Sequence, residues 1–360
     1  MRCVVFLEFL ALYRYGFTQI DIGCSMDVFG QTENGEAVQL IEIAGGGLTA
    51  TIMSWGAVIQ DLRLKGHDAP LVLGFPVFDN YPAHSKYFGA AVGRNVNRIR
   101  NAELVIDGVT HQLEKNFRGT HNLHGGTQGI GTRNWTFVAV SRDEAVLEIR
   151  CPDGNMGFPG NVDVRCTYRV SGKGVLSVLF EAVTDKPTVC NLAQHSYFNL
   201  NDGGLSDSRD HVMQILADAY LPTDEDLIPD GRVLPVAGTT HDFRQPRAIR
   251  HEVNGSQTVY DNTWCFAAGR GAMRKGVRVE GRKSGVVLEV HTGEAGVQFY
   301  AGDTLPAGPA GLTGKPYFQF AGFCLETQGW PDSTHYPYFP SNILRPGETL
   351  RQETEYRFSR

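Results

Sequence analysis

The chain has 360 residues, of which 42% are hydrophobic, and 33 Lys and Arg against 39 Asp and Glu give a formal net charge of −6. This mildly acidic balance, with its charges scattered, argues against a nucleic-acid-binding protein, which needs a clustered basic face. No apolar run approaches the roughly 20 residues of a membrane-spanning helix, so we expect no membrane span.

Residues 1–25 differ from the rest of the chain. Their apolar stretch VVFLEFLALY is interrupted by Glu8 and followed by Arg14, and no small-residue cleavage site comes after it. These features make it a poor secretory signal, so export is the less favoured interpretation. We interpret residues 1–25 as an extension outside the core, with Met26 as an alternative start, and residues 26–360 as the folded domain.

The cysteines bear on the cellular compartment. They lie far apart, without a CxxC pair, at positions Cys3, Cys24, Cys151, Cys166, Cys190, Cys265 and Cys324. An odd and dispersed set fits reduced, buried thiols better than a disulfide framework or a zinc site. We therefore expect a cytoplasmic protein.

From Val28 onward the chain reads as strand, turn, strand. Residues 37–64 alternate apolar and polar side chains around a glycine triplet, which is the period-2 pattern of half-buried strands. Residues 102–114 are two short runs joined by Asp107-Gly108, the strongest short signal for a β-hairpin. Three later segments repeat this design, helical periodicity is almost absent, and no linker divides the chain. We predict an all-β fold: one large, mostly antiparallel β-domain.

Two Gly- and Asn-containing stretches carry polar groups that a β-core does not need. GAAVGRNVNRIRNAEL brings Arg94, Arg98 and Arg100 together, as either a solvated loop or a binding segment would. In NLHGG, His124 precedes two glycines, where the backbone can come close to a ligand because glycine has no side chain. A turn with an incidental histidine explains this second motif equally well.

A histidine lies inside the strand-like run NLAQHSYFNL. An unpaired buried polar group costs about 1–3 kcal/mol, so His195 and the Ser, Tyr and Asn after it each need a partner. One interpretation is a core histidine bonded to a backbone carbonyl. The other is a strand that crosses the floor of an active site, where its neighbours orient the histidine or line the site.

Three more segments carry groups suited to a sugar or to acid–base chemistry. In VYDNTWCF, Asp261 lies near Trp264, and sugars need acceptors for hydroxyls and rings for their C–H faces, although Asp-Asn also suits a turn. In GVQFYAG, Gln298 and Tyr300 share one face of a strand. In GFCLETQGWPD, Glu326 lies deep in a strand between apolar residues. An unpaired buried carboxylate has a raised pKa, which favours a general acid or base; a structural ion pair is the alternative.

The chain resembles the aldose 1-epimerase family, also called galactose mutarotases, in segments that occur in the family's order and approximate spacing. These are GRNVNRI, NLHGG, QHSYFNL, GVQFYAG, GFCLETQGWPD and ILRPGETL, and GTTHDFRQP at 238–246 also looks like a family segment. The resemblance runs from about Val28 to the C-terminus. It implies a large β-sandwich of antiparallel sheets with the sugar in a cleft, no cofactor, no metal, and a free aldose such as galactose or glucose as the substrate.

The resemblance also implies roles for individual residues. It casts His195 as the general acid and Glu326 as the general base. It assigns sugar binding to Asn97, Arg98, His124, Asp261 and Gln298. One departure concerns Asn262, where the family usually has His, and it leaves the shape of that pocket wall, and with it the sugar preference, open.

Interconversion of anomers requires the ring oxygen to gain a proton and the anomeric hydroxyl to lose one, after which the ring opens and recloses on its other face. His195 as an imidazolium would donate the first proton and Glu326 as a carboxylate would accept the second, from opposite sides of the anomeric centre. This unlike pair argues against a glycosidase, which typically uses two carboxylates.

Three other interpretations stay open. A catalytically silent sugar-binding or sensing protein would keep the sugar-binding residues but could lose His195 or Glu326. A hexose-6-phosphate 1-epimerase would need a cluster of arginines for its phosphate, which the run from Arg94 to Arg100 allows. His124, His195 and Glu326 could form a 2-His-1-carboxylate metal set, although no local HxH pair supports one. Both a monomer and a homodimer fit the sequence.

Overall fold

The computed structural model describes residues 26–84, 87–253 and 255–360. Nearly all regular structure in these ranges is strand, and the strand pairs of the largest sheet are antiparallel. The prediction of an all-β, antiparallel fold is confirmed. Residues 1–25 lie outside the described residues, so the boundary between extension and domain stays a prediction.

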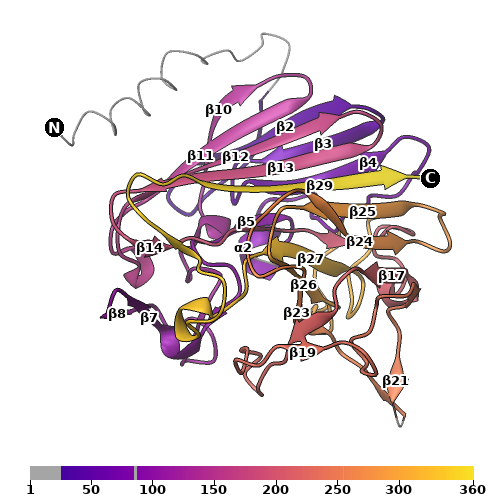
Figure 1. Ribbon diagram of the computed structural model, residues 1–360. Helices are drawn as coiled ribbons and strands as arrows, with labels where there is room; N and C mark the ends of the chain where they lie inside the picture. Colours follow the sequence, from indigo (N-terminus) through magenta and orange to yellow (C-terminus); the bar gives the residue numbers. More distant parts are fainter. Residues whose placement is uncertain (1–25, 85–86, 254) are drawn as a thin grey trace.

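The largest sheet has nine strands and spans the molecule (Figure 1). The last strand of the chain, β29, lies between β13 and β25 and joins the two halves of this sheet. In spatial order the strands are β10 (Thr136–Val140), β11 (Glu144–Cys151), β12 (Val162–Ser171), β13 (Val175–Thr184), β29 (Leu350–Ser359), β25 (Val287–Thr292), β24 (Arg274–Glu280), β17 (Val212–Ile215) and β20 (Arg247–Ala248).

A six-stranded sheet carries several of the candidate site residues. Its strands in spatial order are β16 (Tyr197–Phe198), β27 (Phe323–Gln328), β26 (Gly296–Tyr300), β23 (Asp261–Cys265), β18 (Ala219–Leu221) and β19 (Leu234–Pro235). All six residues of β27 are buried, because this strand has other parts of the protein on both of its faces. A polar side chain on β27 is therefore enclosed whichever way it points.

The remaining elements flank these two sheets. A four-stranded N-terminal sheet contains β1 (Asp27–Gln31), β2 (Ala37–Gly45), β3 (Leu48–Met53) and β4 (Val58–Leu64). Two-stranded ladders pair β5 (Ala90–Val92) with β15 (Ala193–His195), β6 (Arg98–Ile99) with β9 (Asn122–Leu123), β7 (Glu103–Ile106) with β8 (Val109–Gln112), β14 (Thr188–Val189) with β28 (Ile343–Leu344), and β21 (Glu252–Val253) with β22 (Ser256–Gln257). Among the described residues the one α-helix is the short α2 (Asn80–His84), and none of their helices has the length and apolar character needed to cross a membrane.

The period-2 pattern of the sequence explains how the layers pack. Strands β12, β13 and β29 bury alternate side chains, and one continuous core contains apolar side chains of these strands together with others from β2, β3, β25 and β27. The predicted hairpin at Asp107-Gly108 is confirmed: Ile106 pairs with Val109, and both turn residues have positive φ, as a two-residue hairpin turn requires.

Candidate active site

His195 and Glu326 lie close together although they are 131 positions apart in the chain. His195 ends β15, Glu326 lies in β27, and these two strands pack against each other. His195 Nε2 lies 3.6 Å from Glu326 Oε1, and the two residues are 4% and 2% exposed. The two groups thus lie side by side, whereas the sequence analysis expected them on opposite sides of an anomeric centre.

The carboxyl group of Glu326 has a free acceptor. Among the described residues, no group hydrogen-bonds to its buried Oε2. Burial raises the pKa of Glu326 to about 8; the negative charge of Asp261 adds to this rise and Arg98 opposes it. The predicted rise in pKa is confirmed, and its cause is the desolvation that the alternation of β27 indicated.

The imidazole of His195 is shifted in the opposite direction. Burial lowers the pKa of His195 to about 4. Its Nδ1 lies 3.5 Å from Cys324 Sγ, and its ring packs against the rings of Tyr87, His124 and Tyr197. Both shifts favour the neutral forms in the free protein, Glu326 protonated and His195 unprotonated, whereas the roles implied by the resemblance need a carboxylate and an imidazolium.

His124 is held in one tautomer by the backbone. The N–H of Asn97 donates to His124 Nδ1 at 3.1 Å, so in the neutral ring the proton lies on Nε2. Burial, with the nearby His195 and Arg98, keeps the pKa of His124 well below its usual value. Nε2 of His124 is thus a hydrogen-bond donor. The two glycines after it were expected to let the backbone approach a ligand, but a Cβ at Gly125 would lie 2.2 Å from the carbonyl of Gly93, so the close approach is to the chain itself.

A second group of polar side chains is built around Asp261. Arg98 Nη2 donates to Asp261 Oδ2 at 3.1 Å, and Gln298 Nε2 donates to Oδ1 at 2.6 Å. Thr263 Oγ1 in turn donates to Gln298 Oε1, and Asn97 Oδ1 accepts from the N–H of Arg98 at 2.9 Å. The Arg98 and Asp261 side chains are 10% and 15% exposed, so this end of the site is more open than the His195–Glu326 end. The structure brings all seven predicted site residues into one region.

Three residues that the sequence placed near a site have other partners. Trp264 is fully buried and donates from its indole nitrogen to the carbonyl of His241, so it is not a sugar platform. Asn262 Oδ1 accepts from His241 Nε2 at 3.1 Å, and Asn262 Nδ2 donates to the carbonyl of Leu221. Both follow from the strand, since Asn262 and Trp264 lie on the face of β23 opposite to Asp261. Tyr300 shares a face with Gln298 as predicted, but its hydroxyl pairs with Thr304.

The sequence analysis missed two side chains beside His195. The ring of Tyr87 lies 4.7 Å from that of His124 and 5.8 Å from that of His195, and Cys324 contacts His195 Nδ1. Period-2 alternation puts Cys324 on the same strand face as Glu326, so the sequence offered a signal for it. For Tyr87 no local pattern offers one.

A metal site at these residues is opposed by the second nitrogen of His124. Ligand atoms of His124, His195 and Glu326 lie within 4.8 Å of one another, close enough to surround an ion. A histidine that binds a metal through one nitrogen donates from the other to an acceptor. His124 Nδ1 faces the N–H of Asn97, which is itself a donor, so its Nε2 cannot lose its proton without leaving two lone pairs on the ring. The donor set does not fit a metal ion.

Comparisons with known proteins identify relatives of this chain. The sequence model of the family described as aldose 1-epimerase matches residues 39–357. Galactose mutarotase of Rattus norvegicus is 38% identical over 343 residues, covering 94% of this chain and 99% of that protein. Aldose 1-epimerase of Escherichia coli is 35% identical, covering 87% and 92%. The solved structure of an aldose epimerase homologue from C. elegans superimposes with a TM-score of 0.83 at 29% identity, covering 90% and 99%.

Proposed function

The chain belongs to the aldose 1-epimerase family and is an isomerase that interconverts the α and β anomers of free aldoses, and we propose that His195 and Glu326 are the acid–base pair of this reaction. The observation that carries the assignment is the buried pair itself: two unlike titratable groups 3.6 Å apart, with one carboxylate oxygen free to accept. Opposed pKa shifts in a buried pair are typical of acid–base catalysis.

The side-by-side arrangement suits the substrate. The ring oxygen and the anomeric oxygen are bonded to the same carbon, so adjacent protein groups can reach both. We propose that the anomeric hydroxyl donates to Glu326 Oε2, which favours the carboxylate and moves the proton of the pair to His195. His195 then protonates the ring oxygen, Glu326 accepts the anomeric proton, and the C1–ring oxygen bond breaks. After rotation about C1–C2 the reverse transfers close the ring on the other face.

The second polar group holds the sugar in this proposal. His124 Nε2, Arg98 and Gln298 supply donors, and Asp261 supplies acceptors, for the remaining hydroxyls. Asn97 contributes by fixing the tautomer of His124 and the backbone of Arg98. Galactose and glucose are the proposed substrates, since relatives at 35–39% identity are named galactose mutarotase and aldose 1-epimerase.

The structure does not favour a hexose 6-phosphate as the substrate. Arg94 is buried and donates to backbone carbonyls, including those of Pro159 and Gly160. Arg100 pairs with Asp224 and Asp332. Arg94 and Arg100 are thus both engaged by other groups of the protein, which leaves neither of them for a phosphate. We therefore favour a free sugar as the substrate. The intact His195–Glu326 pair likewise favours an enzyme over a silent sensor.

A cytoplasmic location is part of the proposal. The cysteines of the described residues, at Cys151, Cys166, Cys190, Cys265 and Cys324, are all free and buried. Free thiols are typical of proteins in reducing compartments. Cys3 and Cys24 lie outside the described residues.

The pH dependence of kcat/KM should be bell-shaped, with the rate falling below about pH 4 and above about pH 8. Below about 4 both groups are protonated and no base remains; above about 8 both are deprotonated and no acid remains. The pair holds one proton only between these values, whichever group carries it, so the limbs belong to the pair. Initial rates of mutarotation across pH 3–10, expressed as kcat/KM, measure this. A rate that stays flat across both limbs would contradict it.

Polarimetry tests the function itself. Freshly dissolved α-D-galactose and α-D-glucose should reach their usual equilibrium rotation faster with the protein, and the end point should not move. Dialysis against a chelator should leave the rate unchanged, because the His124 tautomer does not suit a metal ligand. A chelator-sensitive rate that returns with added metal would overturn the assignment of the three residues.

A further inference from the structure

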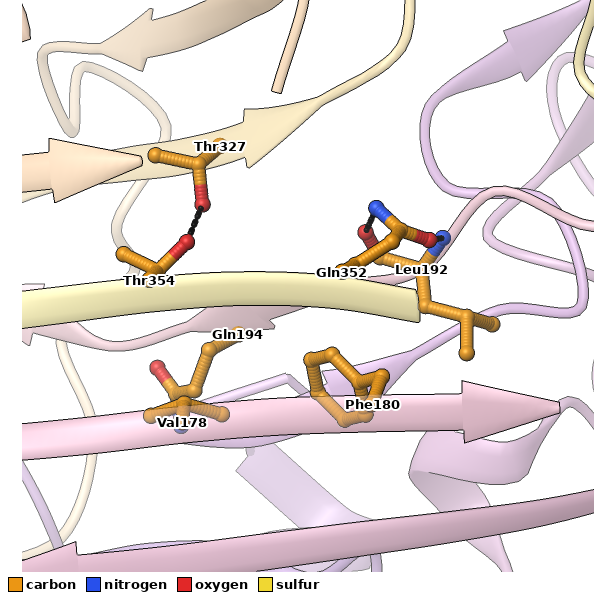
Figure 2. A pocket seen from close by; sticks show the side chains of 7 residues that line it. All are labelled: Val178, Phe180, Leu192, Gln194, Thr327, Gln352 and Thr354. Carbon is orange, nitrogen blue, oxygen red and sulfur yellow. Dashed lines mark hydrogen bonds between the residues drawn. The ribbon is translucent and has the colours of Figure 1, made fainter. Parts of the chain in front are cut away.

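A small buried cavity is lined by residues adjacent in sequence to His195 and Glu326, and Figure 2 shows its lining side chains. Its volume is about 10 Å³, which is room for one water molecule. The side chains around it come from β13, β29, β27, β15 and Leu192; they are Val178, Phe180, Leu192, Gln194, Thr327, Gln352 and Thr354. The inferences that follow rest on the roles proposed above for His195 and Glu326.

Strand alternation links this cavity to the site. Gln194 precedes His195 in β15, and Thr327 follows Glu326 in β27, so in each strand the neighbour of a catalytic residue points the other way. The side chains of Gln194 and Thr327 accordingly line the cavity while those of His195 and Glu326 face the site. Contacts that Gln194 and Thr327 make on the cavity side therefore also fix the positions of His195 and Glu326, the two proposed catalytic residues.

A chain of hydroxyl groups on the cavity side of β27 holds Thr327, the residue that follows Glu326. Thr327 Oγ1 lies 2.6 Å from Thr354 Oγ1 of β29, a hydrogen bond drawn as a dashed line in Figure 2. Thr354 Oγ1 lies 3.1 Å from Thr292 Oγ1 of β25. Thr292 Oγ1 also donates to the carbonyl of Glu353. The three threonines are at most 6% exposed. The hydroxyls thus tie β27 to two strands of the large sheet.

The contact between Thr327 and Thr354 brings β27 and β29 closer together than contact between apolar side chains would. Two hydroxyl oxygens in a hydrogen bond approach to 2.6 Å here, whereas carbon atoms in contact stay roughly 3.5–4.0 Å apart. The cavity lies beside the two threonine side chains, so their hydrogen bond is a main contact that sets the distance between β27 and β29 there. A misplacement of about 1 Å can cost about 10²-fold in rate, even when it begins away from the reacting atoms.

We propose that Thr354 is a positioning residue for the mutarotation reaction: through its hydrogen bond to Thr327 it holds Glu326 at reacting distance from His195 and the sugar. Thr354 touches neither substrate nor the reacting atoms. Its effect belongs to the catalytic step and not to sugar binding, because Arg98, Asp261 and Gln298 are held by their own hydrogen bonds.

The test is a set of matched variants assayed by polarimetry over a range of sugar concentrations. Thr354→Val keeps the shape of the side chain and removes the hydroxyl; kcat should fall about 10-fold while KM changes less than twofold. Thr354→Ser keeps the hydroxyl and should retain kcat within about twofold. Thr184→Val is the control, since Thr184 is a buried threonine of β13 whose hydroxyl bonds the carbonyls of Asn161 and Lys186. It should lower Tm and leave kcat unchanged.

Thr327→Val removes the same hydrogen bond from the other side and should reproduce the loss; it replaces Thr354→Val if that variant does not fold. The proposal is overturned if the valine variant keeps its kcat, if the serine variant loses as much as the valine variant, or if Thr184→Val lowers kcat equally. Failure here is distinct from failure of the proposed function: Glu326→Gln, assayed alongside, must be slow for the catalytic assignment to stand, whatever the threonine variants do.

Discussion

Glu326→Gln should lower kcat for mutarotation by roughly 10²-fold or more, with sugar binding retained. Glutamine keeps the size and the hydrogen-bonding capacity of the side chain but has no proton to exchange near neutral pH. The orphan acceptor at Oε2 is replaced by an amide group that still meets a hydroxyl. His195→Gln should give a loss of similar size, because it removes the other half of the pair.

Two measurements on the same preparation separate catalysis from binding. Polarimetry gives kcat, and calorimetric titration with galactose gives Kd. The matched control is Glu181→Gln, a carboxylate of β13 that pairs with Arg351 at the surface and should leave both values unchanged. Near-normal rates in Glu326→Gln, or equal losses of binding and rate, would contradict the acid–base assignment.

Asp261→Ala should weaken sugar binding and destabilise the fold. The variant removes the partner of Arg98 and of Gln298 at once, and leaves the largely buried guanidinium without its counter-charge. Removing one member of a buried ion pair costs about 3–5 kcal/mol. Urea denaturation measures this loss, and KM or Kd for galactose should rise about 10-fold or more.

The same variant should shift the pH profile in a fixed direction. The negative charge of Asp261 helps to raise the pKa of Glu326, so its removal lowers that pKa and moves the alkaline limb below about 8. Lys186→Ala, which breaks an exposed ion pair with Asp153, serves as the control and should cost less than about 1 kcal/mol. An unchanged alkaline limb and an unchanged KM in Asp261→Ala would place Asp261 outside the site.

Local patterns were sufficient for the fold class and for the burial of Glu326. Alternation predicted the antiparallel strands, Asp107-Gly108 predicted its hairpin, and a carboxylate within an apolar strand predicted the burial and raised pKa of Glu326. Each of these features depends on a few adjacent residues and on the period of the strand.

What the sequence could not predict depends on contacts between distant strands. The charge state of His195 results from burial by β27 and by the rings around it, so no local pattern reports it. Alternation along β23 places Trp264 on the face opposite to Asp261, but only the packing of other elements on that face buries it completely. The hydroxyl contact between Thr327 and Thr354 joins two sheets, and period-2 patterns say nothing of which residues meet across layers.

The central claim is that His195 and Glu326 work as one unit, and a double-variant cycle tests it most directly. Mutarotation rates of α-D-galactose are measured by polarimetry for the wild type, His195→Gln, Glu326→Gln and the double variant, after subtraction of the uncatalysed rate. Groups that act together lose little more when both are removed than when one is. The account predicts that the double variant is about as slow as either single variant; losses that multiply would show two independent contributions and would contradict it.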